Sequence, residues 1–303
     1  MSTATHEARP QRRLDIELLR ILACVGIVLF HTLDTGKALS YSGIVVFTFL
    51  SAWLTLKARP ANWQDKTLRL LRPWAFWFAV YAVFNVLVHR QALGLHPNGF
   101  SMLFAGPSLH LWYMPFIWLW VLILTGIRRW VPASSLSVIG AILFAAAMWS
   151  APAWRPHANE ALAPLAQWAH ATPAIFLGMA CASPLRNRLT WGLLGLGLAG
   201  AGLQSGTDPW LAGPYLLGGS ACMLLSLRAW PVAPQKPRLR RGIAWVAACT
   251  SGIYFTHVLT YQLILRLHWP LDPVLIPWMT IGASMVLITT LRRMAPRWVS
   301  WWS

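Results

Sequence analysis

The stretch Arg20-Ile-Leu-Ala-Cys-Val-Gly-Ile-Val-Leu-Phe-His31 is an apolar run closed at each end by an ionisable side chain. Eleven helical steps return the chain to within roughly 20° of its starting direction, so the two end residues share one helix face. They lie about 16 Å apart along the axis, roughly half the hydrocarbon thickness of a bilayer. Because an ionisable group inside a membrane helix is costly, this face should line a bundle interior or a watery cavity. The stretch therefore predicts a membrane helix that carries a functional face.

The composition is that of an integral membrane protein. Of 303 residues, 57% are hydrophobic and only 11% are charged, whereas soluble domains carry about 25% charged residues. The formal charge of +17 could suggest nucleic-acid binding, but the basic residues stand in short clusters between apolar segments. The four cysteines show neither metal-ligand spacing nor a disulfide framework. We therefore expect no nucleic-acid partner and no bound metal; the lipid bilayer is the first partner.

Apolar segments predict an all-α polytopic protein with about ten transmembrane helices. We expect one membrane domain over residues 16–293, between cytoplasmic tails at 1–15 and 294–303. The segments are 16–35, 43–57, 73–89, 110–127, 135–151, 162–182, 189–204, 211–229, 242–266 and 273–292.

Charge asymmetry predicts the orientation of these segments. If the N-terminus is cytoplasmic, 21 Lys and Arg residues fall on the cytoplasmic side. Only Lys37, Arg90, Arg155 and Arg266 fall on the other. This positive-inside pattern favours an even number of spans with both termini in the cytoplasm, in a multi-pass protein of the inner (plasma) membrane. The histidines divide the other way, and all except His6 belong to the outer half.

His31 is the first candidate for catalysis. Asp34 follows three residues later, close enough on a helix to orient the imidazole or stabilise its charged form. The pair could act as a general base toward a hydroxyl or as a relay for an acyl group. The alternative is a structural histidine beside an aspartate that only marks the water interface.

Arginines on the inner side predict a site for a polyanion. Arg20 lies toward the cytoplasm, and Arg69 and Arg72 stand at i,i+3 directly before Pro73, a residue suited to the first turn of a helix. Paired guanidinium groups beside a helix N-terminus bind phosphate well. The alternatives are a snorkelling Arg20 paired with Glu17, and a basic cluster that binds lipid headgroups.

Five motifs follow one another along the chain: Arg-x10-His (20–31), Gly-Ile-Val-Val-Phe-Thr-Phe-Leu-Ser-Ala-Trp-Leu (43–54), Arg-x-x-Arg (69–72), His-Leu-Trp-Tyr (110–113) and Ser-Gly-Ile-Tyr-Phe-Thr-His (251–257). Together, in the expected order over about residues 12–260, they resemble the type-3 integral membrane acyltransferases. The resemblance implies transfer of an acyl group, commonly acetyl, from cytoplasmic acyl-coenzyme A to a hydroxyl of a cell-envelope or exported glycan or a lipid-linked sugar. It also implies that Arg20, His31, Arg69 and Arg72 matter for activity.

The resemblance adds secondary candidates and two departures. His110, Tyr254 and His257 lie in its motifs, and each has a structural alternative: the histidines could be structural or lining residues and the tyrosine a packing aromatic. Ala52 stands where the family has glycine, and Val258 where it has proline. Some members carry an outer transferase domain at the C-terminus, whereas Ser303 comes just after the last segment here. For an acyltransferase we therefore expect acceptor recognition by the membrane domain or by a separate envelope transferase partner.

The sequence is also compatible with two rival functions. In a transporter or flippase of a polar envelope precursor, the intramembrane Arg and His would line a path. Paired helices broken by Gly or Pro are not evident in corresponding halves, and the chain has only eight Asp and Glu residues for ion coupling. The other rival is a non-catalytic membrane scaffold, which the Arg-x10-His pair disfavours.

Overall fold

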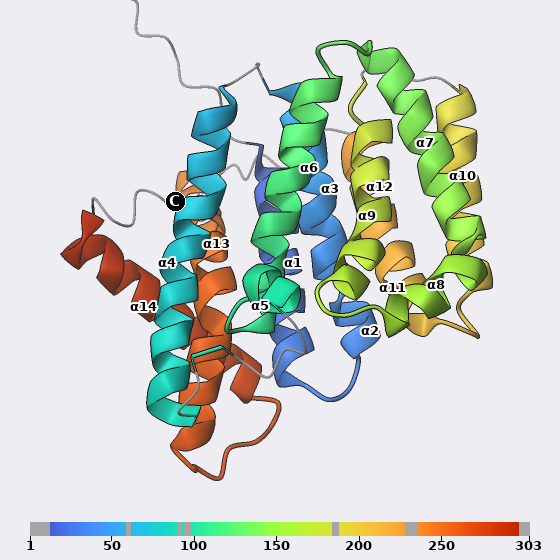
Figure 1. Ribbon diagram of the computed structural model, residues 1–303. Helices are drawn as coiled ribbons and strands as arrows, with labels where there is room; N and C mark the ends of the chain where they lie inside the picture. The colour runs from blue at the N-terminus through green and yellow to red at the C-terminus, as the bar shows by residue number, and fades with distance from the viewer. Residues whose placement is uncertain are drawn as a thin grey trace, which may run out of the picture.

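The computed structural model describes residues 13–58, 62–89, 92–93, 99–183, 188–227 and 236–296. Within these ranges every regular element is a helix, which confirms the all-α prediction. The long helices run side by side, and short helices gather at one end of the bundle (Figure 1). In chain order the elements are α1 (Leu14–Thr32), α2 (Lys37–Ser40), α3 (Ser42–Lys57), α4 (Trp63–His89), α5 (Gly99–Ala105), η1 (Leu109–Trp112), α6 (Tyr113–Ile127), α7 (Ala133–Trp149), α8 (Ala151–Glu160), α9 (Leu165–Ala180), α10 (Arg188–Leu203), α11 (Pro209–Pro214), the π-turn η2 (Tyr215–Gly219), α12 (Ser220–Leu227), α13 (Pro237–Arg266) and α14 (Ile276–Met294).

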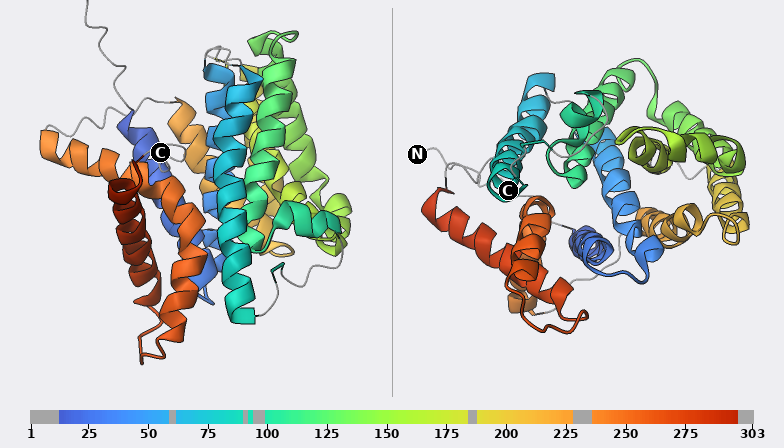
Figure 2. Two further views of the ribbon diagram at one scale, coloured as in Figure 1. Left: turned by 60° about the vertical axis from the view of Figure 1, so that its left-hand side comes forward. Right: turned by 60° about the horizontal axis from the view of Figure 1, so that its bottom comes forward.

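The two helices α1 and α3 form the centre of the bundle. On one side α13 and α14 pack against α1, and on the other side α9 packs against α3 and carries α7 and then α10 (Figure 2). The third neighbour of α3 is α6, which packs in turn against α4. Residues from both ends of the chain therefore meet around α1.

Small residues let the central helices approach closely. A Cβ atom added to Gly43 in α3 would lie 2.3 Å from the carbonyl oxygen of Ala23 in α1. One added to Gly178 in α9 would lie 2.7 Å from the Cβ of Ala52 in α3. Small side chains at helix crossings give close van der Waals packing in membranes. The chain thus keeps a close contact at Ala52 by placing glycine on the facing helix.

Each predicted apolar segment overlaps helical residues, and the segment 211–229 runs over three consecutive elements, α11, η2 and α12. The count of about ten spans is not confirmed. Among the described residues, five helices are long and apolar enough to cross a membrane. The number becomes six if α7 and α8, bent by 76°, count as one broken span. The five are Lys37–Lys57, Trp63–Val88, Leu109–Ile127, Pro209–Leu227 and Pro237–Arg266. Residues 1–12 and 297–303, which include most of the two predicted tails, lie outside the described part of the chain.

The helix α4 begins at Trp63, ten residues before the proline that was predicted to open it. Pro73 lies inside the helix, where it lacks a backbone N–H group. The prediction failed because the first turns of α4 are polar and fall outside an apolar segment. Arg69 and Arg72 therefore lie along the helix and not before its N-terminus, so their predicted position beside a helix end is wrong.

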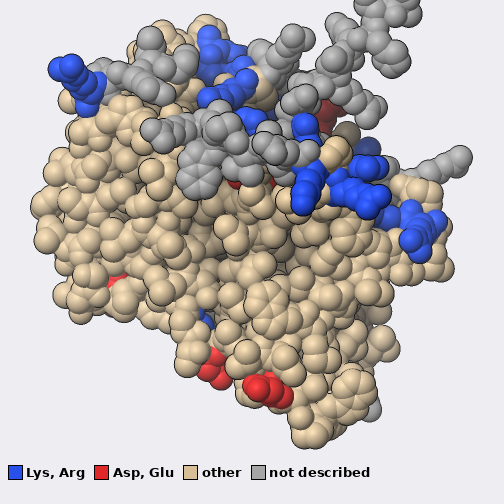
Figure 3. Space-filling model, turned by 180° about the vertical axis from the view of Figure 1, so that it is seen from behind, with Lys and Arg blue, Asp and Glu red and all other residues tan. Residues whose placement is uncertain are grey.

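Lysine and arginine side chains gather at one end of the bundle, which we call the basic end (Figure 3). Two hydrogen bonds join the helix ends there. Lys66 Nζ donates to Thr125 Oγ1 at 2.7 Å, and Arg128 Nη1 donates to the carbonyl oxygen of Thr55 at 2.7 Å. The short helices α2, α5, α8 and α11 lie at the opposite end (Figure 1). The bundle is therefore strongly asymmetric in charge along its axis.

Candidate active site

Two neighbouring cavities lie within the bundle. The first, of about 340 Å³, is lined by His31, His110 and His170 and is called the histidine cavity. The second, of about 610 Å³, is lined by Arg13, Arg20 and Arg69 and is called the arginine cavity. Both cavities are bounded by the same three side chains, Ile27, Ile44 and Tyr254. A wall one side chain thick therefore separates them.

The helix α1 contributes one predicted residue to each cavity. Arg20 lines the arginine cavity and His31 lines the histidine cavity, with Ile27 of the shared wall between them. The apolar turns between the two ionisable residues are packed against α3 and α13, which hold this face of the helix in place. The spacing that marked the stretch in the sequence is thus the spacing between two neighbouring cavities.

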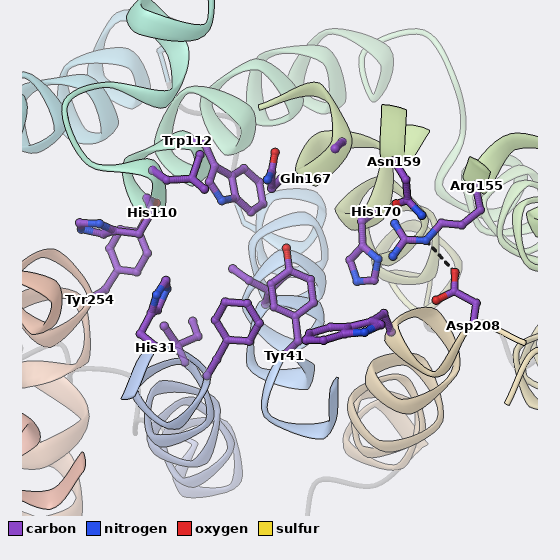
Figure 4. A pocket seen from close by; sticks show the side chains of 16 residues that line it. His31, Tyr41, His110, Trp112, Arg155, Asn159, Gln167, His170, Asp208 and Tyr254 are labelled. Carbon is purple, nitrogen blue, oxygen red and sulfur yellow. Dashed lines mark hydrogen bonds and ion pairs between the residues drawn. The ribbon is translucent and has the colours of Figure 1, made fainter. Parts of the chain in front are cut away.

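Three histidines from distant parts of the chain meet at the end of α1. The ring centroid of His257, in α13, lies 5.0 Å from that of His31 and 5.1 Å from that of His110 in η1. The His31 and His110 centroids are 6.4 Å apart. We call these residues the histidine cluster; Figure 4 shows His31 and His110 facing one another across one end of the cavity, beside Tyr254.

The two buried members of the cluster are each hydrogen-bonded through Nδ1. His257 is completely buried, and its Nδ1 lies 2.8 Å from the carbonyl oxygen of Tyr254, so this nitrogen is the N–H donor. The Nδ1 of His110 is hydrogen-bonded to Ser108 Oγ at 2.8 Å. In both rings Nε2 is buried without a hydrogen-bond partner. His31 is only half-buried and faces the cavity, so it is the most accessible member of the cluster.

Tyrosines hold the cluster in position. Tyr254 donates its hydroxyl hydrogen to the carbonyl oxygen of His110 and thereby ties α13 to η1. Tyr81 in α4 donates to the carbonyl oxygen of Phe255 at 2.8 Å and accepts from the backbone N–H of Leu259 at 3.1 Å. Its ring centroid lies 5.0 Å from that of His110. Buried, fully paired hydroxyls of this kind fix the backbone that carries the histidines.

Asp34 is not part of the cluster. The helix α1 ends at Thr32 and Leu33 is extended, so Asp34 does not continue the helical face of His31. Its carboxylate is fully exposed and pairs with Lys37 Nζ at 3.2 Å. The predicted His31–Asp34 pair is therefore wrong, because the helix stops before the aspartate. In its place, His257 is the polar side chain next to His31.

In the arginine cavity, Arg20 is anchored by two side chains. Its Nη1 pairs with Glu17 Oε2 at 3.2 Å, and its Nη2 donates to Thr250 Oγ1 of α13 at 3.0 Å. The side chain of Arg69, exposed on α4, lines the same cavity. Arg72 is exposed one turn further along α4 and is not among the residues that line it. The structure thus brings two of the three predicted arginines to one cavity.

The histidine cavity contains a second polar group that the sequence did not predict. Arg155, Gln167, His170 and Asp208 line the end away from the histidine cluster (Figure 4). They come from α8, from α9 and from the residue before α11, so their spacing in the chain gives no motif. Their charge and position in an outer loop or span were the only available signals.

A comparison with known protein families places the chain. The family model described as an acyltransferase domain matches residues 13–292. The matched region contains both cavities and all the candidate residues. Neither a curated protein nor a solved structure matches the chain. Since the family model covers more than half of the sequence, the chain belongs to the acyltransferase 3 family of membrane acyltransferases.

Proposed function

We propose that this protein is an O-acyltransferase that takes an acyl group, in the first instance acetyl, from acyl-coenzyme A in the arginine cavity. It delivers the group to a hydroxyl of a cell-envelope or exported glycan in the histidine cavity. The main support for the proposal is the wall that the two cavities share. One layer of side chains separates the cationic cavity from the histidine-lined cavity. An acyl group has to cross only this wall to pass from donor to acceptor.

The charge distribution supports a direction for the transfer. By the positive-inside rule, the basic end belongs in the cytoplasm of a cell whose inner membrane holds the protein. His31 lies in the last turn of α1, which packs against α2, and His110 lies in η1, which packs against α5; α2 and α5 are short helices of the opposite end. The donor would then enter from the cytoplasm and the acceptor from the outer side.

Guanidinium groups suit the donor because coenzyme A carries phosphates, which arginine binds with charge-assisted hydrogen bonds. Arg20 is held by Glu17 and Thr250 and so presents its charge with little loss of side-chain freedom. Arg69, which is exposed, adds another cation to the cavity lining, from α4. Arg72 has a smaller part in this proposal, since its side chain does not line the cavity.

His31 would act as the base for the acceptor hydroxyl. A hydroxyl is a weak nucleophile at neutral pH and needs a base positioned to take its proton. The hydroxyl oxygen forms the new ester bond to the acyl carbon as the carbon–sulfur bond breaks, and the proton leaves with the coenzyme A thiol. His257 contacts the His31 ring, and with Nδ1 engaged, only its Nε2 is left to accept a hydrogen. This neighbour would support the imidazole as it gains a proton.

The test uses the full chain in nanodiscs with acetyl-coenzyme A. Wild-type protein should bind it and slowly release free coenzyme A. His31→Ala should abolish release while insertion and binding persist, and His157→Ala, at an exposed histidine outside the cavity, should behave as wild type. Arg69→Ala should weaken binding more than Arg72→Ala. Absence of binding to intact wild-type protein would refute the donor assignment, and a His31→Ala variant with normal release would refute the catalytic role.

A further inference from the structure

The end of the histidine cavity away from the histidine cluster contains a second polar group that the acyl transfer step does not use. It consists of Arg155, Gln167, His170 and Asp208, which we call the distal group. Figure 4 shows the guanidinium of Arg155 between the His170 ring and the Asp208 carboxylate, with Gln167 across the cavity. A ligand whose hydroxyl reaches His31 would extend toward this group.

The ion pair in the distal group leaves free donors but little net charge. Arg155 Nε donates to Asp208 Oδ2 at 2.8 Å, with the two side chains 13% and 21% exposed. The other carboxylate oxygen, Oδ1, accepts from the backbone N–H of Leu211 at 3.2 Å. Neither Nη group of Arg155 is hydrogen-bonded to a described residue. Because the aspartate balances the arginine, the site favours a neutral ligand over an anion.

Two buried side chains of the distal group have unmet hydrogen-bonding capacity. His170 is 2% exposed, and neither of its ring nitrogens has a partner. The Oε1 atom of Gln167 is likewise buried and unpaired. Buried polar atoms in native proteins are nearly always paired, and leaving one unpaired costs about 1–3 kcal/mol. Both residues line the cavity, so a ligand there can supply the missing partners.

Aromatic rings lie beside these polar groups. The ring centroid of Tyr41 is 4.8 Å from that of His170 and 4.8 Å from that of Phe30. Trp210, also in the cavity lining, has its centroid 6.3 Å from that of Phe30. A ligand must therefore present an apolar face to these aromatic rings. At its edge it needs groups that both donate and accept hydrogen bonds. A saturated ring that carries hydroxyl groups meets both requirements, because its C–H bonds form an apolar face.

We propose that the distal group is the subsite for a neutral sugar ring of the acceptor. Arg155, His170, Gln167 and Asp208 bind its hydroxyls, and Tyr41 and Trp210 cover its apolar face. The cavity volume of about 340 Å³ lies in the roughly 300–1,000 Å³ range of small-molecule sites. The assignment of this sugar as the acyl acceptor rests on the proposed function, whereas its binding does not.

Binding is tested without any acyl donor. Saturation-transfer NMR on nanodisc protein uses methyl β-glycosides of glucose, galactose and mannose as neutral probes and methyl β-glucuronide as the anionic probe. At least one neutral glycoside should give a signal that falls five-fold or more in His170→Phe, which keeps the ring but removes both nitrogens. Asp208→Asn should also lose this signal and gain relative preference for the glucuronide, since Arg155 is then unpaired.

Asp272→Asn is the matched control, because the Asp272 carboxylate caps a backbone N–H, that of Val274 at 2.9 Å, outside the cavity. It should bind as wild type does. Three results would overturn the proposal: no neutral glycoside binds, the wild type prefers the glucuronide, or His170→Phe binds normally. Release of coenzyme A is measured on the same samples. Release of coenzyme A without glycoside binding would refute only the sugar subsite. Glycoside binding without release of coenzyme A would refute only the proposed acyl transfer.

Discussion

Tyr254 donates its hydroxyl hydrogen to the backbone carbonyl of His110, and its side chain belongs to the wall between the two cavities. One residue therefore fixes the position of η1, borders the histidine cluster and closes the arginine cavity. The sequence suggested a packing aromatic here, and the hydrogen bond adds a second contribution to the site.

Removal of this hydroxyl should weaken both the site and the fold. Tyr254→Phe keeps the ring in the wall but leaves the His110 carbonyl without its partner, which costs about 1–3 kcal/mol. We expect a lower Tm and a slower transfer step, with unchanged affinity for acetyl-coenzyme A. Tyr261→Phe is the control, since the Tyr261 hydroxyl makes no hydrogen bond to a described residue. Wild-type transfer by Tyr254→Phe would show that the tether is dispensable.

Turnover should depend on His257, the neighbour of His31, and not on Asp34. Asp34→Asn removes a fully exposed carboxylate paired only with Lys37, so turnover should stay above half of the wild-type value. His257→Phe fills the buried space but removes the nitrogen next to His31, so turnover should fall ten-fold or more. Coenzyme A release by the two variants gives the comparison. If instead Asp34→Asn lost more turnover than His257→Phe, Asp34 and not His257 would be the residue that assists His31.

The aspartate was misassigned because the sequence shows spacing but not where a helix stops. Asp34 is followed by Thr35 and by Gly36, which has a left-handed φ of +70°. Asp, Thr and Gly in succession are typical turn residues, and they were the available sign that α1 ends before them. Apolar length predicted the existence of this helix, and turn chemistry decided its end.

The histidine cluster could be predicted only in part. His31 stood out because it follows a long apolar run, and His110 and His257 entered through motifs. Their convergence depends on α13 packing against α1, a contact between segments more than 200 residues apart in the chain. The distal group lacked even a motif, because Arg155, His170 and Asp208 come from three separate elements. Local patterns predict helices, whereas packing creates the cavities.

The hydroxyl that anchors Arg20 should affect donor binding more than catalysis. Thr250→Val removes the oxygen that accepts from Arg20 Nη2 at 3.0 Å, so the guanidinium loses its fixed position. We expect the KM for acetyl-coenzyme A to rise several-fold while kcat stays within two-fold. Thr260→Val is the control: Thr260 is a buried, hydrogen-bonded threonine of the same helix that lines neither cavity. Equal KM values in the two variants would argue against this role of Thr250.

The crossing of α3 and α9 should depend on the lack of a side chain at Gly178. A Cβ there would lie 2.7 Å from Ala52 Cβ and 2.8 Å from the Phe49 carbonyl oxygen, too close for ordinary contact. Gly178→Ala should therefore destabilise the bundle by about 1–3 kcal/mol, as overpacking typically does. Adding Ala52→Gly removes the first clash but not the second, so the double variant should recover part of the loss. Gly192→Ala in α10, where nothing lies within 4 Å of the added atom, should be neutral or slightly stabilising. Thermal unfolding in nanodiscs measures all three; a double variant no more stable than Gly178→Ala would mean that Ala52 does not limit the approach of the helices.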